Sequence, residues 1–262
     1  MSTTRSPPQF EHLVRLDAHL KTADLLPVAR LLAYLTEEAT LQLTEDGLRV
    51  KTLSDTNVIG LDATIPVEYD TDAEPVTFGV ETDQFLDAVS FIHDPDSIKV
   101  QIRRDDPEIA VSAGSYLNYA DALEPNDPEA IAPHPDVEYE TTATVEAHEL
   151  KRAIATVFGS GDGAVYVTLT GDTLWATVPG VEAVGTASLS DTNGPHTFTR
   201  LSDELFGAIC QRIHPDETLR VSTREAFPFH IEAEHVALTI VPRQLPEDEY
   251  DPLEEGEEKV DA

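Results

Sequence analysis

The stretch Leu41–Ile65 constrains the fold most, because its apolar residues alternate with polar ones in the sequence LQLTEDGLRVKTLSDTNVIGLDATI. Alternation with a period of two is typical of a strand with one buried face, and Asp-Gly is a frequent hairpin turn. The stretch therefore predicts two antiparallel strands joined at Thr44–Gly47, a loop at Ser54–Asn57, and a third strand at Val58–Ile65. The residues expected to face the core in the hairpin are Leu41, Leu43, Leu48, Val50 and Thr52.

Two stretches of the first half predict amphipathic helices, because their apolar residues recur at helical spacing. We expect Thr22 or Asp24 to cap the first helix and Thr82 to cap the second. Pro27 then lies in or near the first turn, where a helix tolerates proline. The apolar faces comprise Leu25, Val28, Ala29 and Leu32 in the first helix, and Phe85, Ala88, Val89 and Ile92 in the second.

The same order of elements recurs in the second half of the chain. The expected elements are a helix at Leu150–Val157, a hairpin with its turn at Thr170–Asp172, and a helix whose apolar face holds Leu205, Ala208 and Ile209. Leu48 corresponds to Leu174 at an offset of 126 residues, and Phe78 corresponds to Phe198 at an offset of 120. We interpret the smaller offset as a deletion in the second copy, where Ser190–His196 is expected to be a short loop. This pattern favours an internal duplication, and chance similarity between two α+β domains is the alternative.

The segment Glu124–Glu140 differs from its surroundings, since it holds four prolines and six acidic residues. Such a composition predicts an extended, semi-rigid connector. We therefore expect an α+β protein with two tandem domains, each built from antiparallel sheets with two helices. The expected boundaries are an arm over 1–9, domains over 10–123 and 141–245, the connector over 124–140, and an acidic tail over 246–262. The tail holds nine acidic residues against one lysine; a role in solubility is favoured over partner contact.

The chain carries 50 acidic and 17 basic residues, which gives a formal net charge of −33. A hydrophobic fraction of 40% argues against disorder, which requires low hydrophobicity together with high charge. The composition is typical of an acid-coated folded protein of a halophile, because molar salt shortens the Debye length to about 3 Å. The N-terminal sequence lacks an apolar signal region, and no apolar run approaches the length of a membrane span. We expect a cytoplasmic protein without a membrane segment.

Motifs of catalysis and metal binding are missing from the sequence. Cys210 is the only cysteine, and its helical apolar neighbours favour a core thiol over a nucleophile. His230 and His235 are spaced unlike the ligands of common zinc sites. The glycine-rich segment Gly159–Gly163 follows a helix and lacks the lysine of a phosphate-binding loop, so we expect a helix end and a turn. We therefore expect no catalytic residue, no cofactor and no metal.

Two segments resemble the sliding clamps of the proliferating-cell-nuclear-antigen (PCNA) family. GLRVKTLSDTNV near the start resembles the first domain of these clamps, and EAFPFHIEAEHVALTIVPR resembles their last hairpin, in which Ile240–Arg243 matches an "LAPR" ending. The resemblance extends over about Phe10–Arg243. Gly60 departs from the family pattern, because the family usually has a bulky apolar residue there. Leu238 and Thr239 also depart, since the family usually has aromatic residues at these positions.

The resemblance implies a homotrimeric ring of two-domain subunits, with helices lining a hole for duplex DNA. Such a ring acts as a processivity factor: it slides, bound without sequence specificity, and tethers DNA polymerase, the clamp loader and other replication and repair enzymes. Phosphate contacts that read no bases suit this role. The alternative for each cation is that it merely offsets nearby acidic residues. The candidate DNA-binding residues are Lys21, Arg30, Lys51, Lys151, Arg152 and Arg212.

The resemblance also implies an apolar groove beneath the connector that receives short clamp-interacting peptides. The alternative is that these side chains belong to the ordinary core. A rival function is an acidic adaptor or decoy with a clamp-like fold that binds replication proteins without encircling DNA. The candidate partner-binding residues are Val58, Leu61, Ile131, Pro133, Pro228, Val241 and Pro242.

Overall fold

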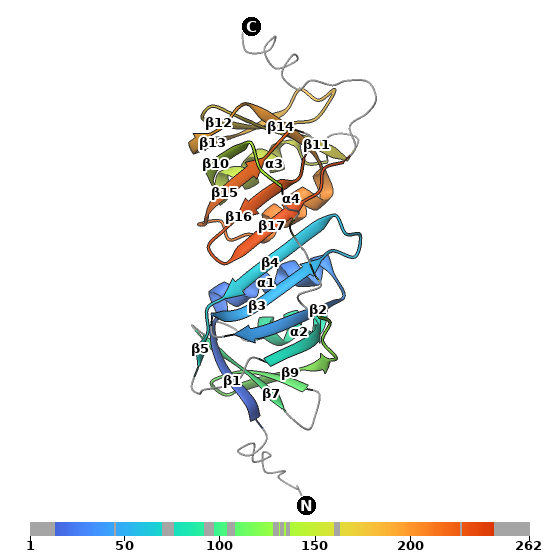
Figure 1. The fold of residues 1–262 in the computed structure, drawn as a ribbon, viewed down its shortest axis with the longest axis vertical. Helices are drawn as coiled ribbons and strands as arrows, with labels where there is room; N and C mark the ends of the chain where they lie inside the picture. The colour runs from blue at the N-terminus through green and yellow to red at the C-terminus, as the bar shows by residue number, and fades with distance from the viewer. Residues whose placement is uncertain are drawn as a thin grey trace, which may run out of the picture. The chain divides into compact units, whose positions relative to one another are not determined.

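The computed structural model describes residues 14–44, 46–69, 76–91, 97–103, 108–127, 131, 134, 137–159, 163–225 and 227–243. Every strand pairing given for these residues is antiparallel, and four helices accompany the strands (Figure 1). The expected α+β class with antiparallel sheets is therefore confirmed. No helix of the described part is long and apolar enough to cross a membrane.

The described residues of the first half form eleven elements. They are β1 (Val14–Lys21), α1 (Thr22–Leu35), β2 (Glu38–Thr44), β3 (Gly47–Leu53), β4 (Ile59–Ile65), β5 (Glu68–Tyr69), β6 (Val76–Glu81), α2 (Thr82–Ser90), β7 (Ser97–Arg103), β8 (Glu108–Ala113) and β9 (Tyr116–Leu123).

Ten elements are formed by the part of the second half that the structure describes. They are β10 (Thr141–Glu146), α3 (Ala147–Val157), β11 (Ala164–Thr170), β12 (Thr173–Thr177), β13 (Val184–Asn193), β14 (Thr197–Ser202), α4 (Asp203–Arg212), β15 (Thr218–Thr223), β16 (Phe229–Glu232) and β17 (Val236–Ile240).

The chain divides into two compact units, with boundaries at Val50/Lys51, Ala63/Thr64 and Pro128/Glu129. Residues Lys51–Ala63 group with the C-terminal unit because β4 pairs with β17, in a register that sets Leu61 opposite Leu238. The domain boundaries at 123 and 141 stay a prediction.

Both predicted hairpin turns are present where the structure describes them. Thr44 pairs with Gly47 across the first turn, and Thr170 pairs with Thr173 across the second, where Gly171 adopts a φ of 53°. The five side chains expected to face the core in the first hairpin are all buried: Leu41, Leu43, Leu48, Val50 and Thr52. Alternation alone was sufficient here because each side chain of a strand points opposite to its neighbours.

The two halves repeat the same pairings, although one predicted offset is wrong by one residue. Leu41 of β2 pairs with Phe78 of β6, and Val167 of β11 pairs with Thr199 of β14. The offset is therefore 126 for the first strand of each pair, as predicted, and 121 for the second, where 120 was predicted. Thr199, and not Phe198, is the counterpart of Phe78. A shift of one residue turns a side chain to the other face of the sheet.

The same correction applies to the second helix of each half. Phe85 of α2 and Phe206 of α4 are 1% and 0% exposed, and both occupy the fourth position of their helices. Leu205, which was predicted on the buried face, is only half-buried. Ser190–Asn193, expected to be part of a loop, continues β13 and pairs with β10. The deletion in the second copy is therefore one residue shorter than the predicted offsets imply.

The predicted helix caps were wrong. The residue preceding α1 is Lys21, and neither α1 nor α2 has a side-chain cap. The buried hydroxyl of Thr82 instead donates a hydrogen bond of 2.5 Å to the carbonyl of Thr36, at the end of α1. This contact joins the start of α2 to the end of α1, so Thr82 serves tertiary structure and not the cap. Pro27 lies inside α1, in its second turn.

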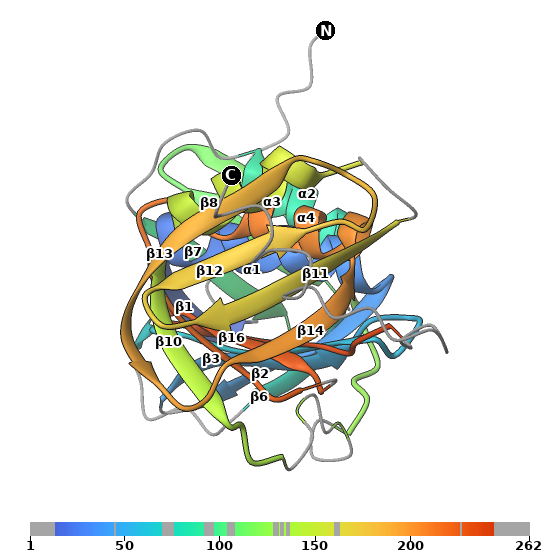
Figure 2. The ribbon, with the colours of Figure 1, turned by 90° about the horizontal axis from the view of Figure 1, so that it is seen from above.

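Helices α3 and α4 cover one face of the strands in the C-terminal unit, as Figures 1 and 2 both show. Gly185 of β13 permits this packing, because a Cβ there would come within 1.9 Å of the carbonyl oxygen of Ala153 in α3. Cys210 is buried in α4, as expected of a core thiol, and burial raises its pKa to about 12. Gly159 follows α3 with a φ of 69°, which fits the expected helix end.

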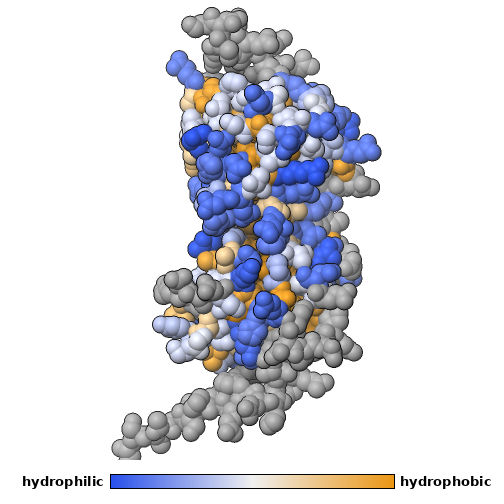
Figure 3. All heavy atoms as spheres, turned by 90° about the vertical axis from the view of Figure 1, so that its left-hand side faces the viewer, coloured by the Kyte–Doolittle hydropathy of each residue, from blue (hydrophilic) through white to orange (hydrophobic). Residues whose placement is uncertain are grey.

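The surface of the described residues is largely polar. Figure 3 shows a face on which hydrophilic side chains predominate and apolar atoms appear in patches between them. Several large apolar side chains are nevertheless exposed in the described part of the chain. They are Phe91, Tyr116, Leu117, Tyr119, Phe158, Phe227 and Val241.

Candidate functional sites

The six candidate DNA-binding cations differ in how free their side chains are. Lys21 and Arg30 are exposed at the start and in the middle of α1. Arg152 is also exposed, with a loose ion pair of 3.8 Å to Glu149 in the same helix. Lys51 is half-buried on β3, and Arg212 donates a hydrogen bond of 2.8 Å to the carbonyl of Ala208.

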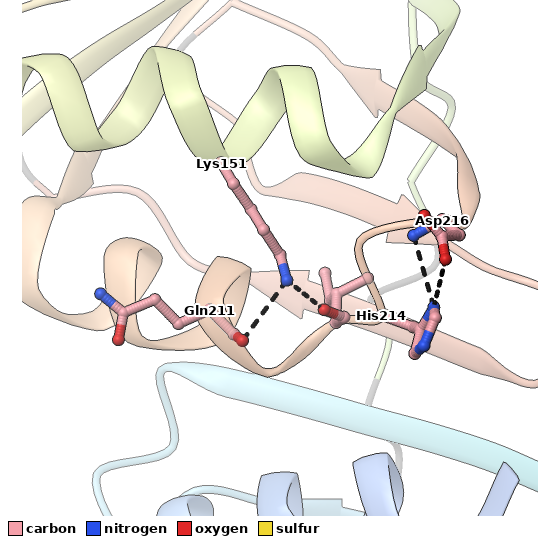
Figure 4. Close-up of polar contacts among 5 residues, drawn as sticks. Lys151, Gln211, His214 and Asp216 are labelled. Carbon is pink, nitrogen blue, oxygen red and sulfur yellow. Dashed lines mark hydrogen bonds and ion pairs between the residues drawn. The ribbon is translucent and has the colours of Figure 1, made fainter. Parts of the chain in front are cut away.

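Lys151 is engaged inside its own unit. Its Nζ reaches from α3 to the end of α4 and donates hydrogen bonds to the main-chain carbonyls of Gln211, at 3.4 Å, and Ile213 (Figure 4). A lysine at a helix C-terminus satisfies carbonyls without an intrahelical partner and complements the negative end of the helix dipole. Burial lowers the pKa of Lys151, while Cys210 and Glu217 act in the opposite direction. The structure thus assigns Lys151 a structural contact.

The loop Ser54–Val58 is built by its own side chains. The hydroxyl of Ser54 accepts hydrogen bonds from the amides of Val58, at 3.2 Å, and Ile59, at 3.1 Å. Asn57 adopts a φ of 55°, in the left-handed region that asparagine tolerates better than most residues. The sequence SDTNV therefore forms a tight loop that delivers Val58 to the start of β4.

Several predicted partner-binding residues come together at one end of β4, β16 and β17. The strand register places Ile59, Ile240 and Phe229 side by side, so the residues beyond them lie at the same end. The amide of Val241 donates a hydrogen bond of 2.8 Å to the carbonyl of Val58. Val58, Pro228 and Pro242 are half-buried there, and Val241 is 43% exposed.

The structure does not place the other three predicted partner-binding residues on this surface. Leu61 is 0% exposed, so its side chain belongs to the core of the free chain. Its role as a partner-binding residue stays a prediction. Ile131 is half-buried. Pro133 lies outside the described residues.

A cluster of polar and aromatic side chains over β16 and β17 was not predicted from the sequence. The Thr239 hydroxyl lies 2.6 Å from Nδ1 of His134 and 2.9 Å from Nδ1 of His230. The two imidazoles meet edge to face at 5.1 Å, and Tyr139 stacks on His230 at 5.5 Å. Thr239 stands where the family resemblance leads one to expect an aromatic residue. This departure was the sequence feature that could have pointed to the cluster.

Burial lowers the pKa of both histidines in this cluster. For His134 the charge of His230 acts in the same direction as burial, and Asp62 opposes it. For His230 the hydrogen bond and the charge of Glu232, together with a main-chain hydrogen bond with Leu238, oppose burial, and the charge of Arg220 acts with it. Burial also raises the pKa of Tyr139. The cluster is therefore held in its uncharged form at neutral pH.

No protein-family model matches the sequence, and a search of curated proteins finds no match. Solved structures do match. A structure described as the C-terminal region of FEN-1 bound to A. fulgidus PCNA matches with a TM-score of 0.76 and 22% identity, over 88% of this chain and 100% of the other. PCNA from Thermococcus kodakaraensis matches with a TM-score of 0.75 and 15% identity, over 86% and 100%. PCNA from Entamoeba histolytica matches with a TM-score of 0.74 and 12% identity, over 88% and 100%.

At identities of 12–22% these matches establish the fold alone. The matches extend over the full length of each of these PCNA chains, so both halves of the present chain take part. The chain has the fold of the PCNA sliding clamps.

Proposed function

We propose that this chain is the subunit of a homotrimeric sliding clamp that encircles duplex DNA and tethers replication and repair enzymes to it. The observation that carries the proposal is the full-length match to PCNA clamps with a TM-score of 0.76. In this role the protein is a processivity factor and performs no catalysis. Its high negative charge of −33 suits a halophilic cell, where salt screens repulsion between charges.

Two strands support ring assembly. Among the described residues, Tyr116–Asp121 of β9 pair with β8, and β6 is reached only at Ala122 and Leu123. Likewise, Val184–Ser188 of β13 pair with β12, and the strand meets β10 from Leu189 onward. A strand edge without a neighbouring strand is a template for pairing with another chain. We propose that Ser115–Ala120 of one subunit pairs with Glu182–Leu189 of the next.

Apolar side chains at β9 support the same interface. Tyr116 and Leu117 are 54% and 42% exposed, and Phe91 at the end of α2 meets the Tyr116 ring edge to face at 6.4 Å. Burying large apolar side chains contributes about 25 cal/mol per Å². High salt does not screen this contribution, so it suits an acidic protein.

Lys21, Arg30 and Arg152 support DNA contact, because they stay exposed at or on helices in a chain with only 17 basic residues. Val58, Val241 and Pro242 support a partner surface at the end of β4 and β17. The matched PCNA bound to the C-terminal region of FEN-1 suggests the same class of partner, a short peptide from a replication or repair enzyme.

Retention on circular DNA tests the proposal. The clamp is loaded with its clamp loader onto a nicked circular duplex in molar KCl, and the circle is then linearised. A ring stays bound to the circle and slides off the linear form, whereas an adaptor or decoy behaves alike on both.

A second variant separates assembly from folding. Tyr116→Asp places a charge in the proposed interface and should convert a trimer to monomers by light scattering, with an unchanged circular dichroism spectrum. Ala155→Asp adds the same charge at an exposed position of α3 and should stay trimeric. A wild type that is monomeric in molar salt, or a Tyr116→Asp variant that remains trimeric, would refute the assembly.

A further inference from the structure

The cluster over β16 and β17 joins residues that lie far apart in the sequence. His134 is 105 residues away from Thr239, yet the two side chains share a hydrogen bond of 2.6 Å. Tyr139 packs its ring against His230 with an interplanar angle of 21°. Thr239 is 1% exposed and His230 is 8% exposed. His134 and Tyr139 are thus held on β16 and β17 by His230 and Thr239.

The hydrogen bonds assign a tautomer to each ring. Nε2 of His230 lies 3.4 Å from a carboxylate oxygen of Glu232, so this nitrogen carries the proton and faces the acceptor. Nδ1 of His230 then accepts from the hydroxyl of Thr239. A hydroxyl has a single proton, so its oxygen must accept from Nδ1–H of His134. The hydrogen bonds therefore form one directed series, in which His134 donates to Thr239, Thr239 donates to His230, and His230 donates to Glu232.

This series of hydrogen bonds requires neutral imidazoles and disfavours an added proton on His134. In its assigned tautomer, His134 has an unprotonated Nε2, which is buried with no hydrogen-bond partner among the described residues. Protonation would place an N–H and a positive charge at this buried position, which is costly without an acceptor. Protonation of His230 at Nδ1 would remove the acceptor of the Thr239 hydroxyl, although a main-chain hydrogen bond with Leu238 favours the protonated ring.

The charged groups facing the two rings come from four strands. Asp62 of β4 and Glu232 of β16 favour protonation of His134, and Lys51 of β3 opposes it. Arg220 of β15 opposes protonation of His230, and Glu232 favours it. Each ring also opposes a charge on the other at 5.1 Å.

The acidic neighbours do not reverse this preference. Burial is the largest influence on both rings and outweighs the acidic groups, so the pKa of each imidazole stays below 6.5. The uncharged Tyr139 ring adds to the burial of His230.

We propose that His134 and His230 form a proton-operated latch, which holds His134 and Tyr139 on β16 and β17 while both rings are neutral and releases them when the rings are protonated. The inference concerns the chain itself and does not depend on ring assembly.

The direction of the switch follows from linkage. In the released state each imidazole is solvated and takes up a proton near its ordinary pKa of 6.5. In the latched state the same proton is bound only at a lower pH. The released state therefore binds more protons, and it gains population as the pH falls below 6.5.

Nuclear magnetic resonance of the full chain tests the latch at constant ionic strength. Samples labelled at histidine Cε1 and at threonine methyl groups are titrated from neutral to acidic pH. His134→Gln and His230→Gln assign the two imidazole signals, and Thr239→Ser checks the methyl assignment while keeping the hydroxyl. We expect both rings to titrate below the ordinary histidine pKa of 6.5, and the nuclear Overhauser contacts between the His134, His230 and Tyr139 rings to disappear in the same pH range.

Two variants serve as controls, one without the two titrating rings and one that keeps them. The double variant His134→Gln/His230→Gln keeps polar side chains but has no titrating ring, so its Thr239 methyl shift should not change with pH. His148→Gln removes an exposed histidine of α3, and its Thr239 methyl shift should change with pH as it does in the wild type. The latch is refuted if His134 and His230 titrate at or above the ordinary pKa of 6.5, or if the ring contacts survive full protonation. Circular dichroism at each pH separates release from unfolding.

Discussion

The ammonium group of Lys151 in α3 donates a hydrogen bond to the carbonyl of Ile213, the residue that follows α4. The second bond, to Gln211, reaches the last turn of the same helix. The side chain of Lys151 in α3 thereby satisfies the carbonyls at the end of α4, and holds the two helices against each other. Its counterpart in α1, at the same helical position, is Leu26, which has no ammonium group to donate such hydrogen bonds.

Lys151→Met should therefore destabilise the protein although it replaces a partly exposed lysine. The expected loss is about 1 kcal/mol, because charge-assisted hydrogen bonds to helix-end carbonyls are removed while the aliphatic stem is kept. Chemical denaturation in constant salt measures it. Arg152→Met is the matched control, since its loose surface pair with Glu149 should contribute at most about 0.5 kcal/mol. Equal effects in the two variants would contradict the structural role of Lys151.

Arg152 is the better probe of DNA contact, because its side chain is exposed and its removal leaves the helix pair intact. Arg152→Gln should lower the slope of log affinity against log salt by about 0.9 for each phosphate that the arginine no longer neutralises. The measurement is a salt titration of clamp retention on circular DNA. Arg220→Gln, on β15 away from the helices, removes the same charge and should leave the slope unchanged. A slope that falls equally in both variants would indicate a general charge effect.

The corrected offset of 121 residues predicts which side chain of α4 supports the core. Phe206→Ala should cost about 3–5 kcal/mol, because it leaves a cavity in a fully buried site. Leu205→Ala should cost clearly less, since Leu205 is half-buried. Thermal unfolding of both variants decides between the two registers. If Leu205→Ala were the more damaging change, the offset of 120 would be restored.

Gly185 and Gly207 both pack closely against a neighbour, and the cost of adding a Cβ should depend on whether that neighbour can move. Gly185→Ala meets the backbone of α3 at 1.9 Å, whereas Gly207→Ala meets the ring of Phe158 at 2.6 Å. A backbone carbonyl in a helix cannot move aside alone, but a ring that is 47% exposed can rotate away. We expect Gly185→Ala to impair folding strongly and Gly207→Ala to be tolerated with a lower melting temperature. Comparable losses in both variants would mean that Phe158 is fixed in place.

The histidine pair predicts a pH dependence of global stability. Both pKa values are lowered in the folded state, so the unfolded state binds more protons below pH 6.5 and stability falls there with acidification. Many carboxylates titrate in acid too, so the comparison is the difference between wild type and His134→Gln/His230→Gln. The free energy of unfolding of the wild type should fall relative to the variant as pH drops below 6.5. A constant difference across this range would contradict the prediction.

Local pattern was enough to predict the first hairpin and the helices. The alternation from Leu41 to Thr52 defined a hairpin, and helical spacing defined four helices, because these signals depend on residues within one or two turns of each other. The recurrence of that order defined two similar halves. The retained cations Arg30 and Arg152 were likewise visible in the sequence as basic residues on expected helices, and both prove to be exposed.

Tertiary structure decided whatever depends on distant residues or on register. A slip of one residue between β6 and β14 still matches similar side chains, so only strand pairing could identify Thr199 as the counterpart of Phe78. Leu61 looks equally apolar whether it is exposed or buried, and its pairing with β17 placed it in the core. In the sequence Lys151 resembles any surface lysine, and only the folded structure places the end of α4 beside its ammonium group. Thr239 becomes the link between two imidazoles only because the fold brings His134 to it across 105 residues.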